Sequence, residues 1–240
     1  MLVILTVQAP PPTSRIVDAV TFADRPDRLY IPLKAVELVG TQADVRRGAA
    51  FVGGKTIPVR DTKSLPDGTL LVSASSLRNR GFILNARGGG LTSLKLKTKP
   101  GSFILLRKGQ KRVIVNKTAQ TMVAFQGERK VLTTRVSTGR EGKTTPTGVF
   151  KAQAYKSPFH RSTLYNDAPM PWAVQIVGNI FIHGFKSVPG RAASSGCIRV
   201  PLTGRNPARW FYSWIEPGVP VGIQGTWPAG ALAPVKKKSS

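Results

Sequence analysis

The sequence contains one cysteine and two histidines among its 240 residues. A single cysteine cannot form a disulfide within the chain, and these three residues cannot complete a four-ligand zinc site without carboxylates. Glycine-rich dinucleotide motifs, Walker motifs and paired metal-ligand motifs are also missing, so we expect no cofactor and no metal. Cys197 lies fourteen positions after His183. Nucleophilic catalysis by this Cys-His pair is the hypothesis that remains.

Acidic residues are scarce as well. Eleven Asp and Glu face 36 Lys and Arg, giving a net charge of +25. The excess is +10 up to Gln110 (17 basic, 7 acidic) and +15 from Lys111 onward (19 basic, 4 acidic). A DNA-binding protein would more often concentrate its charge in a stripe interleaved with aromatics, and no such stripe stands out. A diffuse positive field still favours any polyanionic surface, whether nucleic acid, anionic lipid or a phosphate-bearing envelope polymer, and the charge alone does not choose among them.

Long apolar runs are absent. The longest near the start covers residues 1–9, ends at Pro10-Pro11-Pro12, and is too short to span a bilayer. It resembles the end of a secretory signal with Val7-Gln-Ala9 as the cleavage site, although the positive n-region is missing. A frayed terminus or an edge strand is the alternative. We therefore expect residues 1–28 to be a signal remnant or linker, with structure beginning near Leu29.

Glycine (24) and proline (19) are abundant, which favours turns and short strands over long helices. We expect an α+β, mainly β protein. Residues 29–40 and 70–81 share a plan of strand, helix-length stretch and glycine, and residues 50–59 form a hairpin at Gly53-Gly54. This pattern resembles the small α+β domain of the copper amine oxidase N-terminal-like type, over residues 29–105. Since no His or Cys precedes residue 160, we expect this part to lack catalytic chemistry.

The second half is rich in β-branched residues from Val113 to Val136, which predicts strands with a hairpin turn at Gly127. Its one predicted helix spans 206–216, with Asn206 as N-cap, Pro207 at the first position and Pro217-Gly218 after the end. Residues 95–101 mark either the domain boundary or an edge strand protected by lysines. Residues 226–240 are predicted to be a disordered basic tail.

A free thiol has a pKa of about 8.5 and is largely protonated at neutral pH, so it needs a partner such as His183. Strand-like residues precede both groups, and neighbouring strands would bring them together. The amides of Gly196 and Cys197 could then form an oxyanion hole. Arg199 shares a strand face with Cys197 and could stabilise the anion or bind a substrate carboxylate. The alternatives are a buried thiol, a core histidine and a structural arginine ion pair; His160 is expected to be exposed in a polar loop.

The chain resembles the L,D-transpeptidases of the YkuD type over residues 111–225. Their signature is His-Gly, then Ser-His-Gly-Cys, an apolar residue and Arg or Asn, and here it is His183-Gly184 and Ser194-Ser195-Gly196-Cys197-Ile198-Arg199. Further similar stretches are residues 136–140, 144–150, 162–165 and 168–172. One position departs from the family: Ser195 replaces the usual histidine. If that histidine contributes to activation, activity would be weaker; if it is auxiliary, little changes.

The resemblance implies an exported enzyme in the periplasm or cell wall that acts on peptidoglycan stem peptides. Cys197 would form a thioester with the donor, which then passes to an amine, and His183 would act as base and then acid. Gly196 and the Cys197 amide would hold the oxyanion, with Ser195, Arg199 and Gly184 as catalytic support.

Tyr165, Met170 and Trp172 belong to the segment that borders the cleft. We expect Met170 to pack in the core and Tyr165 and Trp172 to contact substrate. If the resemblance holds, we also expect a monomer that adheres to an anionic cell-envelope surface, with no nucleic acid as a partner.

Two alternatives stay open. The same acyl-enzyme could be hydrolysed, giving a carboxypeptidase or amidase. The protein could also be a basic binding module without catalysis, whose binding would fall steeply with salt.

Overall fold

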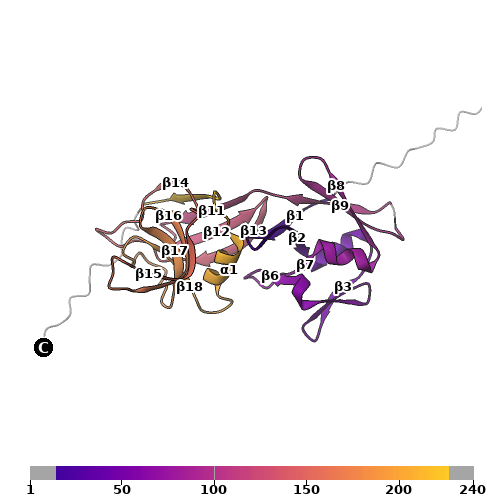
Figure 1. The fold of residues 1–240 in the computed structure, drawn as a ribbon, viewed down its shortest axis with the longest axis horizontal. Coiled ribbons are helices and arrows are strands. Elements are labelled where there is room, and N and C mark those ends of the chain that lie inside the picture. Colours follow the sequence, from indigo (N-terminus) through magenta and orange to yellow (C-terminus); the bar gives the residue numbers. More distant parts are fainter. Residues whose placement is uncertain (1–14, 100, 227–240) are drawn as a thin grey trace, which may run out of the picture. The chain divides into compact units, whose positions relative to one another are not determined.

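The computed structural model describes residues 15–99 and 101–226. The chain divides into two compact units (Figure 1). Unit 1 comprises the chain up to Ala19, Leu29–Lys63 and Leu70–Lys108, and unit 2 comprises Val20–Arg28, Ser64–Thr69 and the chain from Gly109. The signal-like residues 1–9 and most of the basic tail lie outside the described residues. No helix in the described part is long and apolar enough to cross a membrane.

A seven-stranded sheet runs in the order β6-β7-β2-β1-β10-β9-β8, and a small sheet in the order β3-β4-β5. Buried aliphatic side chains from these strands and from two 3-10 helices form one core. The strands are β1 (Arg15–Phe22), β2 (Arg25–Pro32), β3 (Ala43–Arg46), β4 (Ala49–Val52), β5 (Lys55–Ile57), β6 (Thr62–Ser64), β7 (Leu70–Ser73), β8 (Phe82–Arg87), β9 (Leu91–Leu96) and β10 (Phe103–Lys108). The 3-10 helices are η1 (Leu33–Val39), η2 (Val59–Asp61) and η3 (Ala74–Arg80).

The linker expected up to residue 28 is instead, from Arg15 onward, the paired strands β1 and β2. Val17 and Ala19 are buried in β1, and the half-exposed Arg107 pairs with the nearly buried Asp18 at 2.6 Å. The polar residues that suggested a linker are thus accommodated by partners distant in sequence.

The predicted internal repeat is confirmed. β2 leads into η1 and β7 leads into η3, and each 3-10 helix ends at a left-handed glycine, Gly40 or Gly81. The hairpin at Gly53-Gly54 is also confirmed, between β4 and β5. Lys95 and Leu96 end β9, which pairs on both sides and is therefore not an edge strand as one interpretation had it; the edges of this sheet are β6 and β8.

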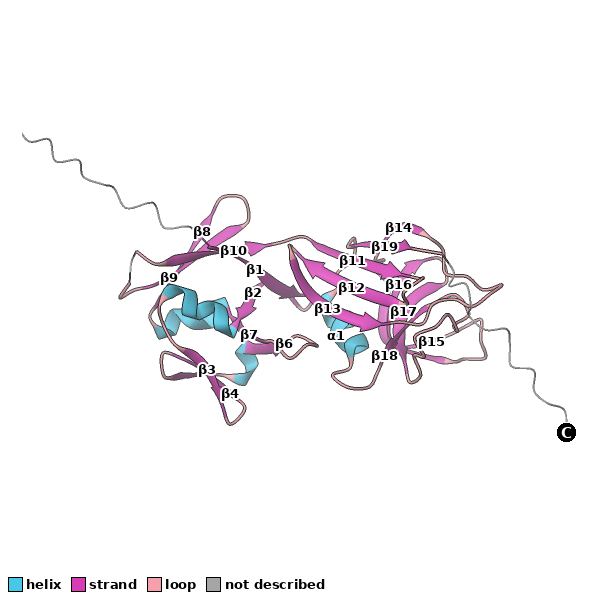
Figure 2. Cartoon of the chain, turned by 180° about the vertical axis from the view of Figure 1, so that it is seen from behind, coloured by secondary structure: helices cyan, strands magenta, loops and turns pink. Residues whose placement is uncertain are grey.

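Unit 2 contains two sheets, of order β13-β12-β11-β19-β14 and β15-β16-β17-β18. Figure 2 shows helix α1 among their strands, and it contacts β13 of the first sheet and β16, β17 and β18 of the second. The strands are β11 (Lys111–Asn116), β12 (Thr121–Gln126), β13 (Arg129–Arg135), β14 (Gly148–Lys151), β15 (Lys156–Arg161), β16 (Pro169–Val177), β17 (Ile180–Phe185), β18 (Ile198–Pro201) and β19 (Pro220–Gln224). The mainly β prediction is confirmed.

Helix α1 (Pro207–Trp214) has the predicted caps. The Asn206 side chain accepts a hydrogen bond from the Arg209 amide, and Pro207 occupies the first turn. At the other end, Lys111 donates to the Trp214 carbonyl at 2.7 Å and Lys156 donates to the Ile215 carbonyl at 2.7 Å. Two lysines therefore satisfy carbonyls that a helix end leaves without intrahelical partners.

Candidate active site

β17 and β18 are parallel neighbours, and this pairing brings His183 close to Cys197. His183 stands opposite Arg199 in the register, and Cys197 immediately precedes β18. Because alternate residues of a strand share a face, Cys197 and Arg199 lie on one side of the sheet, one pleat apart. Residues 186–197 lead from β17 back to the start of β18, and in this way His183 and Cys197, fourteen positions apart in the sequence, come to lie close together.

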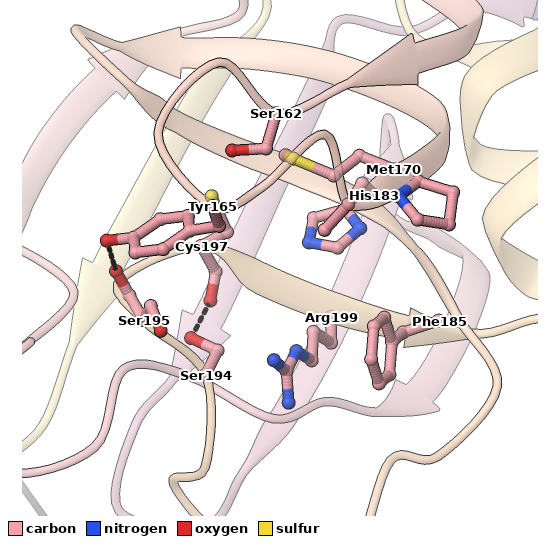
Figure 3. Close-up of a pocket in the computed structure, with 11 residues that line it drawn as sticks. Ser162, Tyr165, Met170, His183, Phe185, Ser194, Ser195, Cys197 and Arg199 are labelled. Atoms are coloured by element: carbon pink, nitrogen blue, oxygen red, sulfur yellow. Dashed lines mark hydrogen bonds between the residues drawn. The ribbon is translucent and has the colours of Figure 1, made fainter.

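One pocket is lined by both residues. Figure 3 shows the Tyr165 ring, Cys197 and Ser195 at one side of it and the His183 ring, Arg199 and Phe185 at the other. The structure therefore gathers Cys197, His183, Arg199, Ser195 and Tyr165 at one place. Among the described residues, no three His, Cys, Asp or Glu side chains are grouped as metal ligands would be.

His183 is 4% exposed. Burial lowers its pKa to about 4; the bond to Gly184 opposes this and the positive charge of Arg199 adds to it. Nδ1 lies 3.0 Å from the Gly184 carbonyl oxygen, which can only accept, so Nδ1 carries the proton. The imidazole is consequently neutral at pH 7, with Nε2 available as a base.

Burial raises the pKa of the Cys197 thiol, while the Phe181 backbone amide and the Arg199 charge act in the opposite direction. The partly exposed thiol donates to the Asn179 carbonyl at 3.5 Å. The partner that the sequence suggests, His183, therefore does not hold Cys197 as a thiolate in the resting protein. Desolvation of the thiolate dominates, because the nearby imidazole is itself neutral.

The turn before the nucleophile is held by hydroxyl groups. Ser194 Oγ accepts from the Gly196 amide at 3.1 Å and donates to the Cys197 carbonyl. Thr145 Oγ1 donates to the Gly196 carbonyl at 2.6 Å and accepts from the Gly139 amide at 2.8 Å. Since the Gly196 amide already has an acceptor, the Cys197 amide is the simpler candidate for binding an oxyanion.

At Gly139 the backbone lies so close to the backbone of residues 143–145 that there is no room for a side chain. A Cβ added there would lie 2.0 Å from the Lys143 carbonyl oxygen and 2.6 Å from the Thr145 nitrogen, both backbone atoms. Sequence reasoning missed Gly139, Thr145 and Ser194 as site residues. The sequence did offer a signal for these residues, because all three lie in polar stretches that resemble the family. We expected only turns there.

Gly184 lies buried in β17, where an added Cβ would be 2.4 Å from Leu202 Cδ2 and 3.1 Å from the Pro171 carbonyl oxygen. The lack of a side chain at Gly184 therefore lets Leu202 and Pro171 pack closely against β17 next to His183. Ser195 donates no side-chain bond to the nucleophile; instead its Oγ accepts from Arg140 at 2.8 Å, and its carbonyl accepts from Tyr165 at 3.1 Å.

Met170 packs in the core as expected: it is buried in the apolar cluster with Ala173 and Phe181, and it also borders the pocket. Trp172 is not among the lining residues; its ring lies 5.5 Å from the Tyr212 ring and 5.5 Å from the Arg209 guanidinium carbon, on α1. A left-handed backbone at Trp172 (φ 58°) interrupts the regular alternation of β16, which explains why the two side chains part.

His160 is also placed differently from the expected loop. It lies in β15, accepts or donates a 2.9 Å hydrogen bond with Tyr155, and stacks on Phe181 at a centroid distance of 4.6 Å. Phe181 belongs to the small apolar cluster against which Cys197 packs. The second histidine is thus a packed strand residue near the site.

Residues 110–223 match the family model of the YkuD L,D-transpeptidase catalytic domain. This segment, somewhat less than half of the chain, is similar to YkuD domains. It contains β11 to β18, most of β19 and every residue of the pocket described above. No curated protein sequence shows a significant match to the chain.

Several solved structures are similar to this chain. An L,D-transpeptidase from Stackebrandtia nassauensis is 23% identical over 50% of this chain and 58% of its own, with a TM-score of 0.45. One from Xylanimonas cellulosilytica is 23% identical over 49% and 61%, with a TM-score of 0.42. An L,D-transpeptidase from Mycobacterium smegmatis is 15% identical over 91% and 97%, with a TM-score of 0.45. The chain thus spans about three fifths of the first two, and the similarity to YkuD domains rests on the family match.

Proposed function

We propose that this protein is a peptidoglycan L,D-transpeptidase that forms a thioester on Cys197 and transfers the acyl group to an amine. The observation that carries this proposal is the meeting of a neutral His183 and a partly exposed Cys197 in one pocket of the segment that is similar to YkuD domains. Acyl transfer needs a nucleophile and a base that stays unprotonated at neutral pH, and this pair supplies both.

The first half-reaction starts from an uncharged thiol and imidazole. As Sγ attacks the donor carbonyl, Nε2 of His183 takes the thiol proton, so the thiolate never has to exist alone in the partly apolar pocket. Collapse of the tetrahedral intermediate breaks the C–N bond, and His183 returns the proton to the departing D-amino acid. The product is a Cys197 thioester and a neutral imidazole.

The second half-reaction repeats the proton transfer with another nucleophile. An acceptor amine attacks the thioester, His183 removes its proton, and the thiol leaves with that proton. The developing oxyanion would accept from the Cys197 amide, and the half-buried positive charge of Arg199 would stabilise it further. Water in place of the amine would give the carboxypeptidase outcome.

The test is incubation with a stem tetrapeptide, alone and with a second stem as acceptor, followed by mass spectrometry of protein and products. We expect an acyl adduct on Cys197 and a cross-linked dimer when both stems are present. Cys197→Ala should lose both, and His183→Ala should lose most of the turnover. Free tripeptide without any dimer would replace transpeptidation by hydrolysis, and absence of an adduct would remove the thioester mechanism.

We further propose that the protein acts outside the cytoplasm, where peptidoglycan lies, and that its charge favours adherence to anionic envelope surfaces. No Asp or Glu occurs between Asp67 and Glu128, whereas Lys and Arg recur throughout. Unit 1 keeps the strand, 3-10 helix and glycine repeat, and we propose that it is a non-catalytic domain of the copper amine oxidase N-terminal-like type.

A further inference from the structure

Two guanidinium groups lie beside the turn that precedes Cys197, and neither forms an ion pair with a carboxylate of the described residues. Arg199 lines the pocket, with its guanidinium carbon 4.0 Å from the centre of the Phe185 ring and Nη1 3.3 Å from the Ala193 carbonyl oxygen. In Figure 3 its guanidinium lies between Phe185 and Ser194. Within residues 15–99 and 101–226, no carboxylate forms an ion pair with it.

Arg140 approaches the same side from the rim. Its Nη1 donates to Ser195 Oγ at 2.8 Å and lies 3.4 Å from the Ser194 carbonyl oxygen, while its own amide donates to that carbonyl at 2.9 Å. Backbone and side chain thus fix Arg140 beside the nucleophile turn. The described carboxylates form no ion pair with Arg140 either, and the residue is exposed, with only Nη1 of its guanidinium seen to bond within the described residues.

The two arginines repel each other. Burial lowers the pKa of Arg199, and the charge of Arg140 lowers it further. Holding two like charges together without a counter-charge is unfavourable unless an anion binds between or beside them.

We propose that Arg140 and Arg199 form a carboxylate-binding subsite on the Ser194-Ser195 side of the Cys197 thiol. This proposal rests on the proposed function and makes Arg140 a specificity-determining residue for the donor. A guanidinium presents parallel N–H groups that match the two oxygens of a carboxylate, so a free carboxylate is favoured over a carboxamide.

A stem-peptide donor offers this chemistry from two sources. One is the terminal carboxylate of the D-amino acid that leaves, and the other is a side-chain carboxylate of the residue that becomes the acyl group. Both lie within a few bonds of the attacked carbonyl, as the short distance between the arginines' anchors and Cys197 requires.

The experiment compares three donors: the free tetrapeptide, its terminal carboxamide, and its side-chain carboxamide. Charge-assisted hydrogen bonds predict that wild-type kcat/KM falls about tenfold to a hundredfold for one of the two amides, which identifies the source. Arg140→Gln should lose a similar factor on the free peptide and no longer discriminate between acid and amide. Arg140→Lys should recover part of the discrimination. Arg135→Gln, which removes an exposed arginine of β13, is the matched control.

Ser195→Ala separates binding from positioning. It removes the side-chain anchor of Arg140 but keeps its charge, so some discrimination between acid and amide should remain. If Ser195→Ala and Arg140→Gln give the same loss with discrimination unchanged in both, Arg140 only positions the turn and the subsite is refuted. Alkylation of Cys197 by iodoacetamide, a neutral reagent, at the same slow rate as in wild type shows that each variant keeps Cys197 in its folded, buried setting.

Binding of the three peptides to Cys197→Ala, measured by calorimetry, distinguishes this proposal from the proposed function. Turnover without any preference between acid and amide would overturn the subsite and leave the transpeptidase intact. Discrimination in binding without turnover would keep the subsite and overturn the transpeptidase. Loss of both would remove both proposals.

Discussion

Replacing His183 by glutamine tests whether burial of the imidazole causes its low pKa. The folded pKa of about 4 lies below the unfolded value of 6.5, so the unfolded chain binds a proton more readily between these values. The stability that burial of the neutral His183 contributes is therefore fully present above pH 6.5 and is lost as the pH falls through 4. For a side chain only 4% exposed, this corresponds to about 3 kcal/mol.

The measurement is urea unfolding at about pH 7.5 and about pH 4.5, where wild type should lose roughly 2 to 3 kcal/mol through His183 alone. Glutamine keeps a donor for the Gly184 carbonyl but does not titrate. Between the two pH values, the free energy of unfolding of His183→Gln should therefore fall by roughly 2 to 3 kcal/mol less than that of wild type. Tryptophan fluorescence suits the assay because the tryptophans of the described residues, Trp172, Trp210 and Trp214, all belong to unit 2. His160→Gln controls for removal of a histidine elsewhere. Equal losses in wild type and His183→Gln would refute the reasoning.

Three further predictions concern the same unit. Because burial raises the pKa of Cys197, its alkylation by iodoacetamide should be slow near neutral pH and rise about tenfold per pH unit above it; a flat rate would reveal a preformed thiolate. Thr145→Ala should lower the free energy of unfolding by about 1–3 kcal/mol and reduce turnover, since the Gly139 amide and the Gly196 carbonyl lose a buried partner, while the exposed Thr133→Ala should change neither. Trp172→Ala should lower the melting temperature without changing KM for the donor, because Trp172 packs on Tyr212; a raised KM at unchanged melting temperature would restore its predicted substrate contact.

Local patterns predicted the local structure well. The caps of α1, the hairpin at Gly53-Gly54 and the two glycine-ended 3-10 helices each depend on a few adjacent residues with restricted backbone preferences. The mainly β fold followed in the same way from β-branched runs and frequent turns. Strand β1 was missed because the prolines before it dominated the composition of that stretch.

Contacts between residues far apart in the sequence could not be predicted from it. Thr145 reaches Gly196 across 51 residues and Arg140 reaches Ser195 across 55, and no spacing rule predicts such pairs. The direction of the Cys197 pKa depends on how far the thiolate is desolvated, which is a property of the assembled pocket. The left-handed backbone at Trp172, within β16, is likewise a local departure from regular strand geometry that the sequence did not reveal.

The protonated state of Cys197 also bears on how long the protein survives where oxidants are present. Peroxides attack thiolates far faster than thiols, and the first product, a sulfenic acid, leads on to irreversible acids. A thiol that stays protonated is largely spared that damage. The sequence holds no second cysteine, so a sulfenic acid on Cys197 could form a disulfide only with a thiol from outside this sequence. Burial of the thiol thus lowers the reactivity of Cys197 at rest and slows its oxidation.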